Sequence, residues 1–465
     1  MPPRQPKPAT SPLPPRTLIV DNGASTLKAG YTLPTDSHNP STENDCHTIP
    51  NCITRSRTKR IYVGASLSQC ADYGEMSFRR PMEKGYTVNW ECEKEIWEQT
   101  FFDEEKAVSG LKVEDPGETA VVVTEAPNAP NALQGNIEQV LFEEFGFGGV
   151  SRCTGASLNA WNRGEDLGFG DRGGGGGGVE QLPLECLMLI DSGYSHTYVT
   201  PLYRGRLIQS AVRRLDVGGK LLTNYLKELI SIRHFGLMDE PYIVNEIKEK
   251  VSFVSRDFNK DLDRVKYFGR GSKTKANSQG EGDQEGIVLD YVLPDYETNH
   301  HGFSRPHDAS VAAKLSRLGA TPGIPGAKKE DVFPLGNERF VPPELLFNPS
   351  DIGLKQDGLP GIIIQSLNAL PEGLKAGMVA NICVVGGNAL IPGFVERLEE
   401  EVRSRVPAEM EVRLTRPKDP IKATWLGGAR MASDPERLKK VLITREEYQE
   451  YGQAWVTRQF ATRHI

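Results

Sequence analysis

Two stretches of the chain place an aspartate and a glycine directly after an apolar run. Asp21 and Gly23 follow the run LIV, and Asp191 and Gly193 follow the run LMLI. A carboxylate at a strand end can hold a metal ion or its water ligands, and a glycine lets the backbone approach a ligand closely. Successive backbone N–H groups of such a turn can bind phosphate oxygens. The pair therefore predicts two phosphate-binding turns, although an ordinary β-turn uses the same residue types.

A third candidate element is the glycine pair Gly386 and Gly387. It ends the apolar run NICVV and comes just before a segment with helical periodicity. A flat adenine base could lie against bare backbone there, close to a helix N-terminus. The alternative is a strand-to-helix turn that needs a positive φ.

Buried strands and amphipathic helices are predicted to position these turns. Continuous apolar runs at 17–23, 120–126, 184–191 and 381–387 are typical of strands in the middle of a covered sheet. Helical periods follow at 217–232, 241–254 and 393–406, the last with an apolar stripe formed by Phe394, Leu398, Val402 and Val406. Strands that alternate with helices predict an α/β chain with mainly parallel sheets.

The first two turns share one layout: an apolar strand, Asp-x-Gly, a turn and a second strand. Such self-similarity predicts two lobes with related folds that face each other across a cleft.

The composition favours a soluble globular protein of at least two lobes. The chain has 465 residues, 38% of them hydrophobic, whereas a single core stops growing at roughly 250–300 residues. The net charge of -7 argues against binding nucleic acid through bulk electrostatics. The 7 cysteines form no Cys-x-x-Cys pair, no apolar run is long enough for a membrane span, and the N-terminus has no apolar signal core. We expect an intracellular protein with reduced thiols, in the cytosol or the nucleus.

Three segments are predicted to lie outside the compact core. Residues 1–16 are rich in proline and predict a disordered or polyproline-II tail. Residues 162–181 contain a glycine run, and residues 266–329 mix Gly, Ser, Lys and Pro around a strand-like stretch at 287–293. Both of these segments are interpreted as surface insertions.

The two Asp-x-Gly turns and the later glycine pair, in this order, resemble the pattern of the actin fold, which actins, Hsp70 chaperones and sugar kinases share. The segments RLDVGGKLLTNYL, NEIKEKVSFVSRDF, ERFVPPELLF, GNALIPGF and TWLGGARMAS each look like the matching actin segment, so the resemblance narrows to the actin superfamily. Within it, RRPMEKGYTVNWECEKEIW, IDSGYSHTYVTP, FNPSDIG and VLITREEYQEYG resemble the actin-related protein 6 family most.

This resemblance implies a two-lobed α/β fold, with duplicated Asp-x-Gly β-hairpin subdomains around a nucleotide cleft. The first lobe would comprise residues 17–185 plus about 430–465, with a short outer subdomain at about 43–82. The second lobe would comprise residues 186–429, including the insertion at 266–329.

The resemblance also implies a set of nucleotide-binding residues, with no metal ligand and no catalytic residue assigned. The matching positions are Asp21, Gly23, Lys28, Asp191, Gly193, Gly219, Lys220, Lys248, Glu249, Gly386 and Gly387.

Five positions depart from the actin pattern. Ala24 replaces the serine that holds the terminal phosphate, and Tyr194 replaces an acidic residue. Gly155 stands where actin has the glutamine that positions the attacking water, and Tyr198 where it has a helper histidine. A lysine on the nucleoside side is replaced by Ile421.

The loss of both water-handling side chains predicts no meaningful ATP hydrolysis, because positioning and electrostatics supply most of phosphoryl-transfer catalysis. His196 lies near Tyr198, but strand alternation is expected to aim it differently. Two states of the cleft stay open: ATP bound without hydrolysis, or an empty cleft held shut by side chains such as Tyr194.

Proteins of the resembled family are nuclear subunits of Swr1/SRCAP-type remodelling complexes, which exchange an ordinary core histone for its Z variant. The resemblance implies a non-catalytic scaffold whose partners are the remodeller ATPase subunit and a zinc-HIT-type subunit. Contact with the nucleosome would come through the complex, and neither membrane association nor filament formation is expected. The alternatives are a nucleotide-dependent ATPase and a cytoskeletal actin-related protein.

Overall fold

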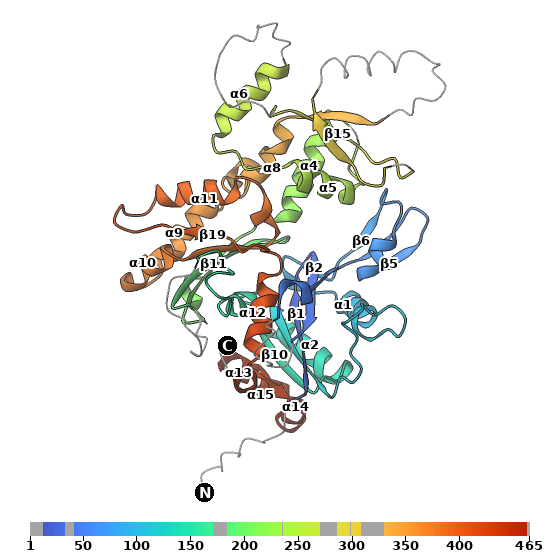
Figure 1. The fold of residues 1–465 in the computed structure, drawn as a ribbon, viewed down its shortest axis with the longest axis vertical. Helices are drawn as coiled ribbons and strands as arrows, with labels where there is room; N and C mark the ends of the chain where they lie inside the picture. Colours follow the sequence, from blue (N-terminus) through green and yellow to red (C-terminus); the bar gives the residue numbers. More distant parts are fainter. Residues whose placement is uncertain are drawn as a thin grey trace.

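The computed structural model describes residues 13–32, 41–170, 184–234, 236–269, 286–297, 299–307 and 330–462. Figure 1 shows two α/β lobes, each with a smaller outer part at the same end of the molecule. The duplicated architecture predicted from the two Asp-x-Gly turns is confirmed by the two large sheets.

The first lobe is built on a mixed sheet with the order β20-β10-β9-β1-β2-β3. Its strands are β1 (Arg16–Asn22), β2 (Thr26–Tyr31), β3 (His47–Pro50), β9 (Thr119–Glu125), β10 (Gly149–Thr154) and β20 (Ile443–Thr444). β1 and β2 form an antiparallel hairpin, and β9 and β10 continue the sheet in parallel with β1. The buried faces of β1 and β9 make the centre of this lobe.

The second lobe repeats this pattern in the order β13-β12-β11-β18-β19. Its strands are β11 (Cys186–Ser192), β12 (Thr197–Tyr203), β13 (Arg206–Leu207), β18 (Ile382–Val385) and β19 (Leu414–Thr415), and β14 (Arg213–Leu215) also pairs with β12. β11 and β12 form the hairpin, and β18 and β19 run parallel to β11. The same arrangement in both lobes places their hairpin turns at equivalent sites.

Helices cover both sheets (Figure 1). They are α1 (Trp90–Trp97), α2 (Asn131–Gln139), α3 (Gly155–Asn159), α4 (Gly219–Arg233), α5 (Pro241–Val251), α6 (Phe258–Gly269), α8 (Val341–Glu344), α9 (Leu359–Asn368), α10 (Glu372–Val379), α11 (Phe394–Arg403), α12 (Ala423–Ala432), α13 (Pro435–Val441), α14 (Arg445–Tyr451) and α15 (Gln453–Thr462). Shorter turns include η8 (Gly387–Leu390). The predicted stripe on α11 is confirmed for Phe394, Leu398 and Val402, which are fully buried, whereas α11 ends at Arg403 and Val406 beyond it is only partly buried.

The outer part of each lobe carries a small sheet. In the first lobe β4 (Ile53–Arg55), β5 (Ile61–Val63) and β6 (Ser77–Arg79) form one sheet, followed by the hairpin of β7 (Met82–Glu83) and β8 (Tyr86–Thr87). In the second lobe β15 (Leu289–Val292) lies between β16 (Phe303–Pro306) and β17 (Val332–Leu335).

The interpretation of residues 266–329 as a surface insertion is wrong for the part that the structure describes. Tyr291 of β15 is fully buried and packs with Phe333 of β17 and Val244 of α5 in the core of the outer second lobe. Residues 270–285 and 308–329 lie outside the described residues. The proline-rich tail is also shorter than predicted, because Leu13 packs on the first lobe and β1 begins at Arg16.

The segment 162–170 was predicted to be the start of a surface insertion, and this too is wrong. Leu167 is fully buried against the second-lobe sheet, where its carbonyl accepts a hydrogen bond from Thr415 Oγ1 at 2.8 Å. Asp166 forms an ion pair with Arg430 of α12 at 2.5 Å. We name residues 162–170 the strap, because they link α12, which packs on the first-lobe sheet, to the second lobe. The glycine run itself, at 173–178, lies outside the described residues.

We expect Leu167→Ala to lower the free energy of unfolding by roughly 2–5 kcal/mol, because it removes buried methyl groups and leaves a cavity. Chemical denaturation followed by circular dichroism measures the change. The control Ile232→Ala, at a side chain that is 81% exposed, should change stability by about 0.5 kcal/mol or less. Equal, small effects of the two substitutions would show that the strap does not dock on the core.

Candidate functional site

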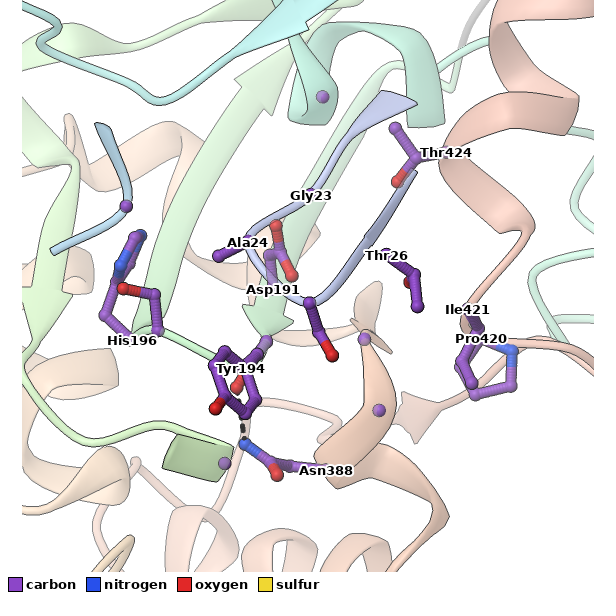
Figure 2. A pocket seen from close by; sticks show the side chains of 18 of the residues that line it. Gly23, Ala24, Thr26, Asp191, Tyr194, His196, Asn388, Pro420, Ile421 and Thr424 are labelled. Carbon is purple, nitrogen blue, oxygen red and sulfur yellow. Dashed lines mark hydrogen bonds between the residues drawn. The ribbon is translucent and has the colours of Figure 1, made fainter. Parts of the chain in front are cut away.

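Both lobes present their hairpin turns to one cavity of about 460 Å³ (Figure 2). The turns join β1 to β2 and β11 to β12, and they have the same register: Asp21 lies opposite Lys28, and Asp191 lies opposite Tyr198. Both predicted Asp-x-Gly turns are therefore hairpin turns at equivalent positions. Thr124 at the end of β9 donates a hydrogen bond to Asp21 at 2.8 Å and holds that carboxylate in place.

Ten of the eleven predicted binding residues line this cavity. They are Asp21, Gly23, Lys28, Asp191, Gly193, Gly219, Lys248, Glu249, Gly386 and Gly387. Lys220 is the exception: its side chain is exposed outside the cavity lining, and its backbone N–H donates to the Tyr194 carbonyl at 2.7 Å. Neighbouring residues of a helix point about 100° apart, so Gly219 faces the cavity while Lys220 turns away.

The second turn is held against the N-terminus of α4. The N–H of Gly219 donates to the Gly193 carbonyl at 3.0 Å, and Asn388 Nδ2 of η8 donates to the same carbonyl at 2.9 Å. A Cβ atom at Gly218 would lie 2.5 Å from the backbone nitrogen of His196, so only glycine permits this approach. The first amides of α4 are consequently committed to the turn.

Asp191 carries a charge with little compensation. It has accessible surface, but this surface faces the cavity. Burial raises the pKa of its carboxyl to about 6, the nearby Asp21 raises it as well, and Lys28 offsets the change only in part. The ammonium of Lys28 lies closer to the other carboxylate, 3.6 Å from Asp21 Oδ2.

Lys248 is buried, and its ammonium group contacts oxygen atoms of the protein. Its Nζ donates to Asn245 Oδ1 at 2.9 Å, to Thr223 Oγ1 at 3.0 Å and to the Gly219 carbonyl at 3.3 Å. An ammonium group has three N–H donors, so these acceptors use all of them. Burial lowers the pKa of Lys248 to about 8. The residue holds α5 to α4 and has no N–H left for a ligand in this arrangement.

The positions that depart from the actin pattern lie at the cavity itself. Ala24, Gly155, Tyr194, Tyr198 and Ile421 all line it, so the side chains that differ from the actin pattern face the cavity. The hydroxyl of Tyr198 donates to the Pro127 carbonyl at 3.2 Å. Gly155, at the start of α3, has no side chain that could reach a water molecule.

The prediction that His196 points away from Tyr198 is wrong. Both residues line the cavity, and their rings meet edge to face with centroids 4.5 Å apart. His196 belongs to the turn, and residues two positions apart in an extended chain share a face. Burial and the nearby Arg214 lower the pKa of His196 to about 4, so the ring is neutral near pH 7.

Two arginines connect the lobes at the cavity, and sequence reasoning missed both. The guanidinium of Arg80, after β6, lies 4.9 Å from the centre of the Tyr194 ring and donates to the Ser25 carbonyl of the first turn at 3.4 Å. Arg214 of β14 lies 5.6 Å from the centre of the Tyr86 ring. We call these two pairs the arginine clasp. Each arginine contacts an aromatic residue more than a hundred positions away in the sequence, and such a contact leaves no periodic pattern in the sequence.

The outer parts of the lobes also touch. Tyr73 stacks on Tyr242 of α5, with ring centroids 4.2 Å apart and planes 5° from parallel. Nearby, the carboxylate of Glu240 accepts a hydrogen bond from the N–H of Glu75 at 2.9 Å. These contacts join the outer parts of the two lobes.

The residues present do not fit a nucleoside triphosphate well. Both lining lysines are engaged with the protein, and Tyr194 projects between the first turn and Asn388 (Figure 2). The first amides of α4, a favourable place for phosphate, donate to the second turn instead.

Asp191→Asn is expected to stabilise the protein at pH 7.5 and to lose this effect near pH 4. The folded-state pKa of about 6 exceeds the ordinary 3.8, so the folded protein retains a proton that the unfolded chain loses between these values. The free energy of unfolding therefore falls as the pH rises from about 4 to about 6, where the Asp191 carboxyl ionises in the folded protein. Asparagine cannot ionise, so the variant does not lose this stability. We expect a gain of about 1 kcal/mol, because cavity water screens the charge.

Melting temperatures of both proteins across pH 4–8 test this. The control Asp263→Asn, at a side chain that is 62% exposed, should show no such pH trend. A gain for Asp191→Asn that is equal at pH 4 and pH 7.5 would contradict the proposed cause.

Arg80→Ala should loosen the lobes, because it removes both the cation–π contact and the bond to the first turn. We expect faster amide hydrogen exchange at residues 23–25 and 193–196 and a larger radius of gyration by small-angle scattering. The control is Arg57→Ala in the same outer subdomain, where the side chain is 62% exposed and pairs with Asp72. If amide hydrogen exchange at both turns is the same as in the unaltered protein, the contacts of Arg80 do not restrain the lobes.

Comparison with known proteins agrees with the geometry. The family model described as Actin matches residues 13–461. The chain is 51% identical over 458 residues to the actin-like protein arp6 of Aspergillus fumigatus, covering 98% of this chain and 96% of that protein. It is 46% identical to actin-related protein 6 of Neurospora crassa, covering 97% and 96% of the two chains. It is 35% identical to actin-related protein 6 of Drosophila melanogaster, covering 94% and 97%. The chain thus belongs to the actin family, in its actin-related protein 6 branch.

Proposed function

We propose that the chain is a non-catalytic scaffold subunit of an ATP-dependent chromatin-remodelling complex of the Swr1/SRCAP type, which exchanges a core histone for its Z variant in the nucleus. The remodelling role is supported by the sequence resemblance to the actin-related protein 6 family. The non-catalytic role is supported by one observation: the cavity keeps the two hairpin turns, while glycine and tyrosine occupy the positions of the two water-handling side chains.

Phosphoryl transfer needs an oriented water molecule and stabilisation of developing charge. Gly155 offers no polar atom from a side chain. The hydroxyl of Tyr198 is already bonded to the Pro127 carbonyl, and the neighbouring His196 is neutral and packed against the backbone of Gly85. The loss of a single such group commonly slows a reaction by about a hundredfold.

The arginine clasp supports the scaffold role. A subunit that serves as a rigid surface needs its lobes held in one arrangement, and here side chains of the protein supply that restraint. By the same family resemblance, the proposed partners are the remodeller ATPase subunit and a zinc-HIT-type subunit, with nucleosome contact through the complex. We do not propose that the protein forms filaments. The outer subdomain of its first lobe contacts the second lobe through Tyr73 and Tyr242, which engages part of that subdomain within the molecule. Within the described ranges, no helix is both long and apolar enough to span a bilayer.

Purified protein should hydrolyse ATP at least about a hundredfold more slowly than an actin in the same assay, because both water-handling groups are missing. Asp191→Ala should leave any residual rate unchanged. Phosphate release with Mg-ATP measures the turnover. Hydrolysis at an actin-like rate that Asp191→Ala abolishes would defeat the non-catalytic role.

Replacement of residues 309–328 by about eight Gly and Ser residues tests where partners bind. The described residues on either side of this segment are linked, since Arg305 and Glu330 form an ion pair at 3.0 Å, and the replacement retains the buried β15. We expect a folded monomer that no longer co-purifies with the remodeller ATPase subunit, as read by affinity purification and mass spectrometry.

The matched control replaces residues 172–182 in the same way, and this variant should still assemble. Assembly of both variants would mean that residues 309–328 are a tolerated loop. Failure of the unaltered chain to co-purify with any remodeller subunit would defeat the proposed function.

A further inference from the structure

We propose that Glu93 of α1 is a proton switch for the first Asp-x-Gly turn: its neutral carboxyl holds Asn51 on this turn, and ionisation of the carboxyl releases Asn51. Both residues lie in the interior of the first lobe behind the turn, and neither lines the cavity. The inference follows from the burial of Glu93, from two buried oxygen atoms that lack a donor, and from the hydrogen bonds of Asn51.

Glu93 is a carboxyl group inside the first lobe. It is 1% exposed and lies on the face of α1 that buries Ile96 and Trp97 in the core. Trp97 Nε1 donates to Glu93 Oε1 at 3.1 Å, whereas Oε2 is buried without a hydrogen-bond partner. An ionised carboxylate in such a place is costly unless a cation or several N–H donors compensate its charge.

Two buried oxygen atoms lack a donor here. One is Glu93 Oε2, and the other is Oδ1 of Asn51, a fully buried residue whose side chain faces the Glu93 carboxyl. Buried polar atoms without a partner are rare in folded proteins and cost free energy. One proton on Glu93 removes both deficits, because the neutral carboxyl donates and Asn51 Oδ1 accepts.

The first turn sets the orientation of the Asn51 amide. Asn51 Nδ2 donates to the Gly23 carbonyl at 3.0 Å and to Asn22 Oδ1 at 3.4 Å. Exchanging the amide oxygen and nitrogen would place two acceptors together at the Gly23 carbonyl, and acceptors repel each other. The nitrogen therefore faces the turn, and the oxygen is left to find a donor in the interior.

No ion pair of Glu93 is found in the part of the chain that the structure describes. The charged and titratable groups of the surrounding elements have other partners or stay neutral: Arg79 pairs with Glu91 at 2.8 Å, Lys28 pairs with Asp21 at 3.6 Å, Arg80 donates to the carbonyls of Ser25 and Asn51, and burial raises the pKa values of the Cys52 and Cys92 thiols. Burial raises the pKa of Glu93 to about 7, and the polar side chains that face it offset this only in part.

Asn51 connects the proton to the turn. Its backbone N–H donates to the Ser25 carbonyl at 2.8 Å, so the main chain and the side chain of one residue together hold residues 23 and 25. When Glu93 ionises, the carboxylate repels Asn51 Oδ1 and attracts Nδ2. The amide then turns toward Glu93 and gives up the Gly23 carbonyl, and the first turn loses one of its restraints.

Hydrogen exchange of the full chain, with and without Glu93→Gln, tests the switch. The readout is the protection factor of peptides that cover residues 22–28, which corrects for the intrinsic effect of pH on exchange. We expect it to fall about fivefold or more between pH 5.5 and pH 8.5 in the unaltered protein, because the turn opens locally. Glu93→Gln should stay protected at both pH values, since its amide donates as the neutral carboxyl does.

The matched control is Glu95→Gln, at an exposed residue of the same helix, and it should behave like the unaltered protein. Asn51→Ala removes the acceptor and should give low protection at both pH values. This second variant keeps the test valid if Glu93→Gln does not fold, as judged by circular dichroism. A pH dependence that survives in either Glu93→Gln or Asn51→Ala would overturn the proposal.

Infrared difference spectra between the two pH values detect the proton itself. The unaltered protein should lose a carboxylic-acid C=O band that Glu95→Gln retains and Glu93→Gln lacks. The comparison separates Glu93 from Asp191 and Glu125, whose carboxyls also have raised pKa values. Identical difference spectra for Glu93→Gln and the unaltered protein would show that Glu93 does not exchange a proton in this range.

Melting temperatures give an independent readout. The folded-state pKa of about 7 exceeds the ordinary 4.5, so the folded protein keeps a proton that the unfolded chain loses between these values. Stability of the unaltered protein therefore falls as the pH rises through this window, and Glu93→Gln lacks that fall. The melting temperature of Glu93→Gln should rise relative to the unaltered protein between pH 5 and pH 8. A difference that is equal at both pH values would contradict the switch.

Discussion

The carbonyl groups of Gly193 and Tyr194 accept hydrogen bonds from the first two amides of α4, and Gly218 makes this approach sterically possible. The rest of the cavity depends on this contact. It fixes the backbone of the second turn, directs the Tyr194 ring toward Arg80, and uses helix N-terminal donors that would otherwise favour an anion. A local backbone constraint thus positions the turn that carries Tyr194 and occupies the first amides of α4.

The cavity also contains a carboxylate whose charge is poorly compensated. Asp191 has no ion-pair partner among the described residues, and its carboxyl has a raised pKa because desolvation and Asp21 both disfavour the charged form. An uncompensated carboxylate destabilises the folded state. In a phosphate clamp, the positive charge of a metal ion or a lysine would offset this cost. Here Lys248 is withdrawn into hydrogen bonds between α4 and α5, and Ile421 supplies an apolar surface. The cleft therefore has the framework of a nucleotide site with altered electrostatics.

Much of the fold could be predicted because it rests on local patterns. The apolar runs at β1, β9, β11 and β18 and the stripe on α11 reflect burial that each segment needs wherever it packs. The predictions failed where a segment has a weak pattern but strong tertiary partners. The strap is polar and glycine-rich, yet Leu167 and the ion pair of Asp166 dock it on two lobes. The strand predicted from the strand-like stretch at 287–293 is confirmed as β15, whereas its burial against α5 and β17 is a tertiary contact that the local pattern does not record.

The sequence by itself determined the α/β class and the duplicated hairpins, because the periodicity of burial and the Asp-x-Gly spacing are local in the chain. The resemblance to the actin family implied eleven binding residues, and ten of them line the cavity. Only the tertiary structure decided that Lys220 faces away, that His196 meets Tyr198, and that Arg80 stacks on Tyr194. The first two cases depend on where the cavity lies relative to α4 and the second turn, which the packing of the lobes decides. The third joins residues more than a hundred positions apart, which carry no shared pattern that records the contact. The chemistry of this cavity therefore depends on contacts between lobes that only the folded chain brings together.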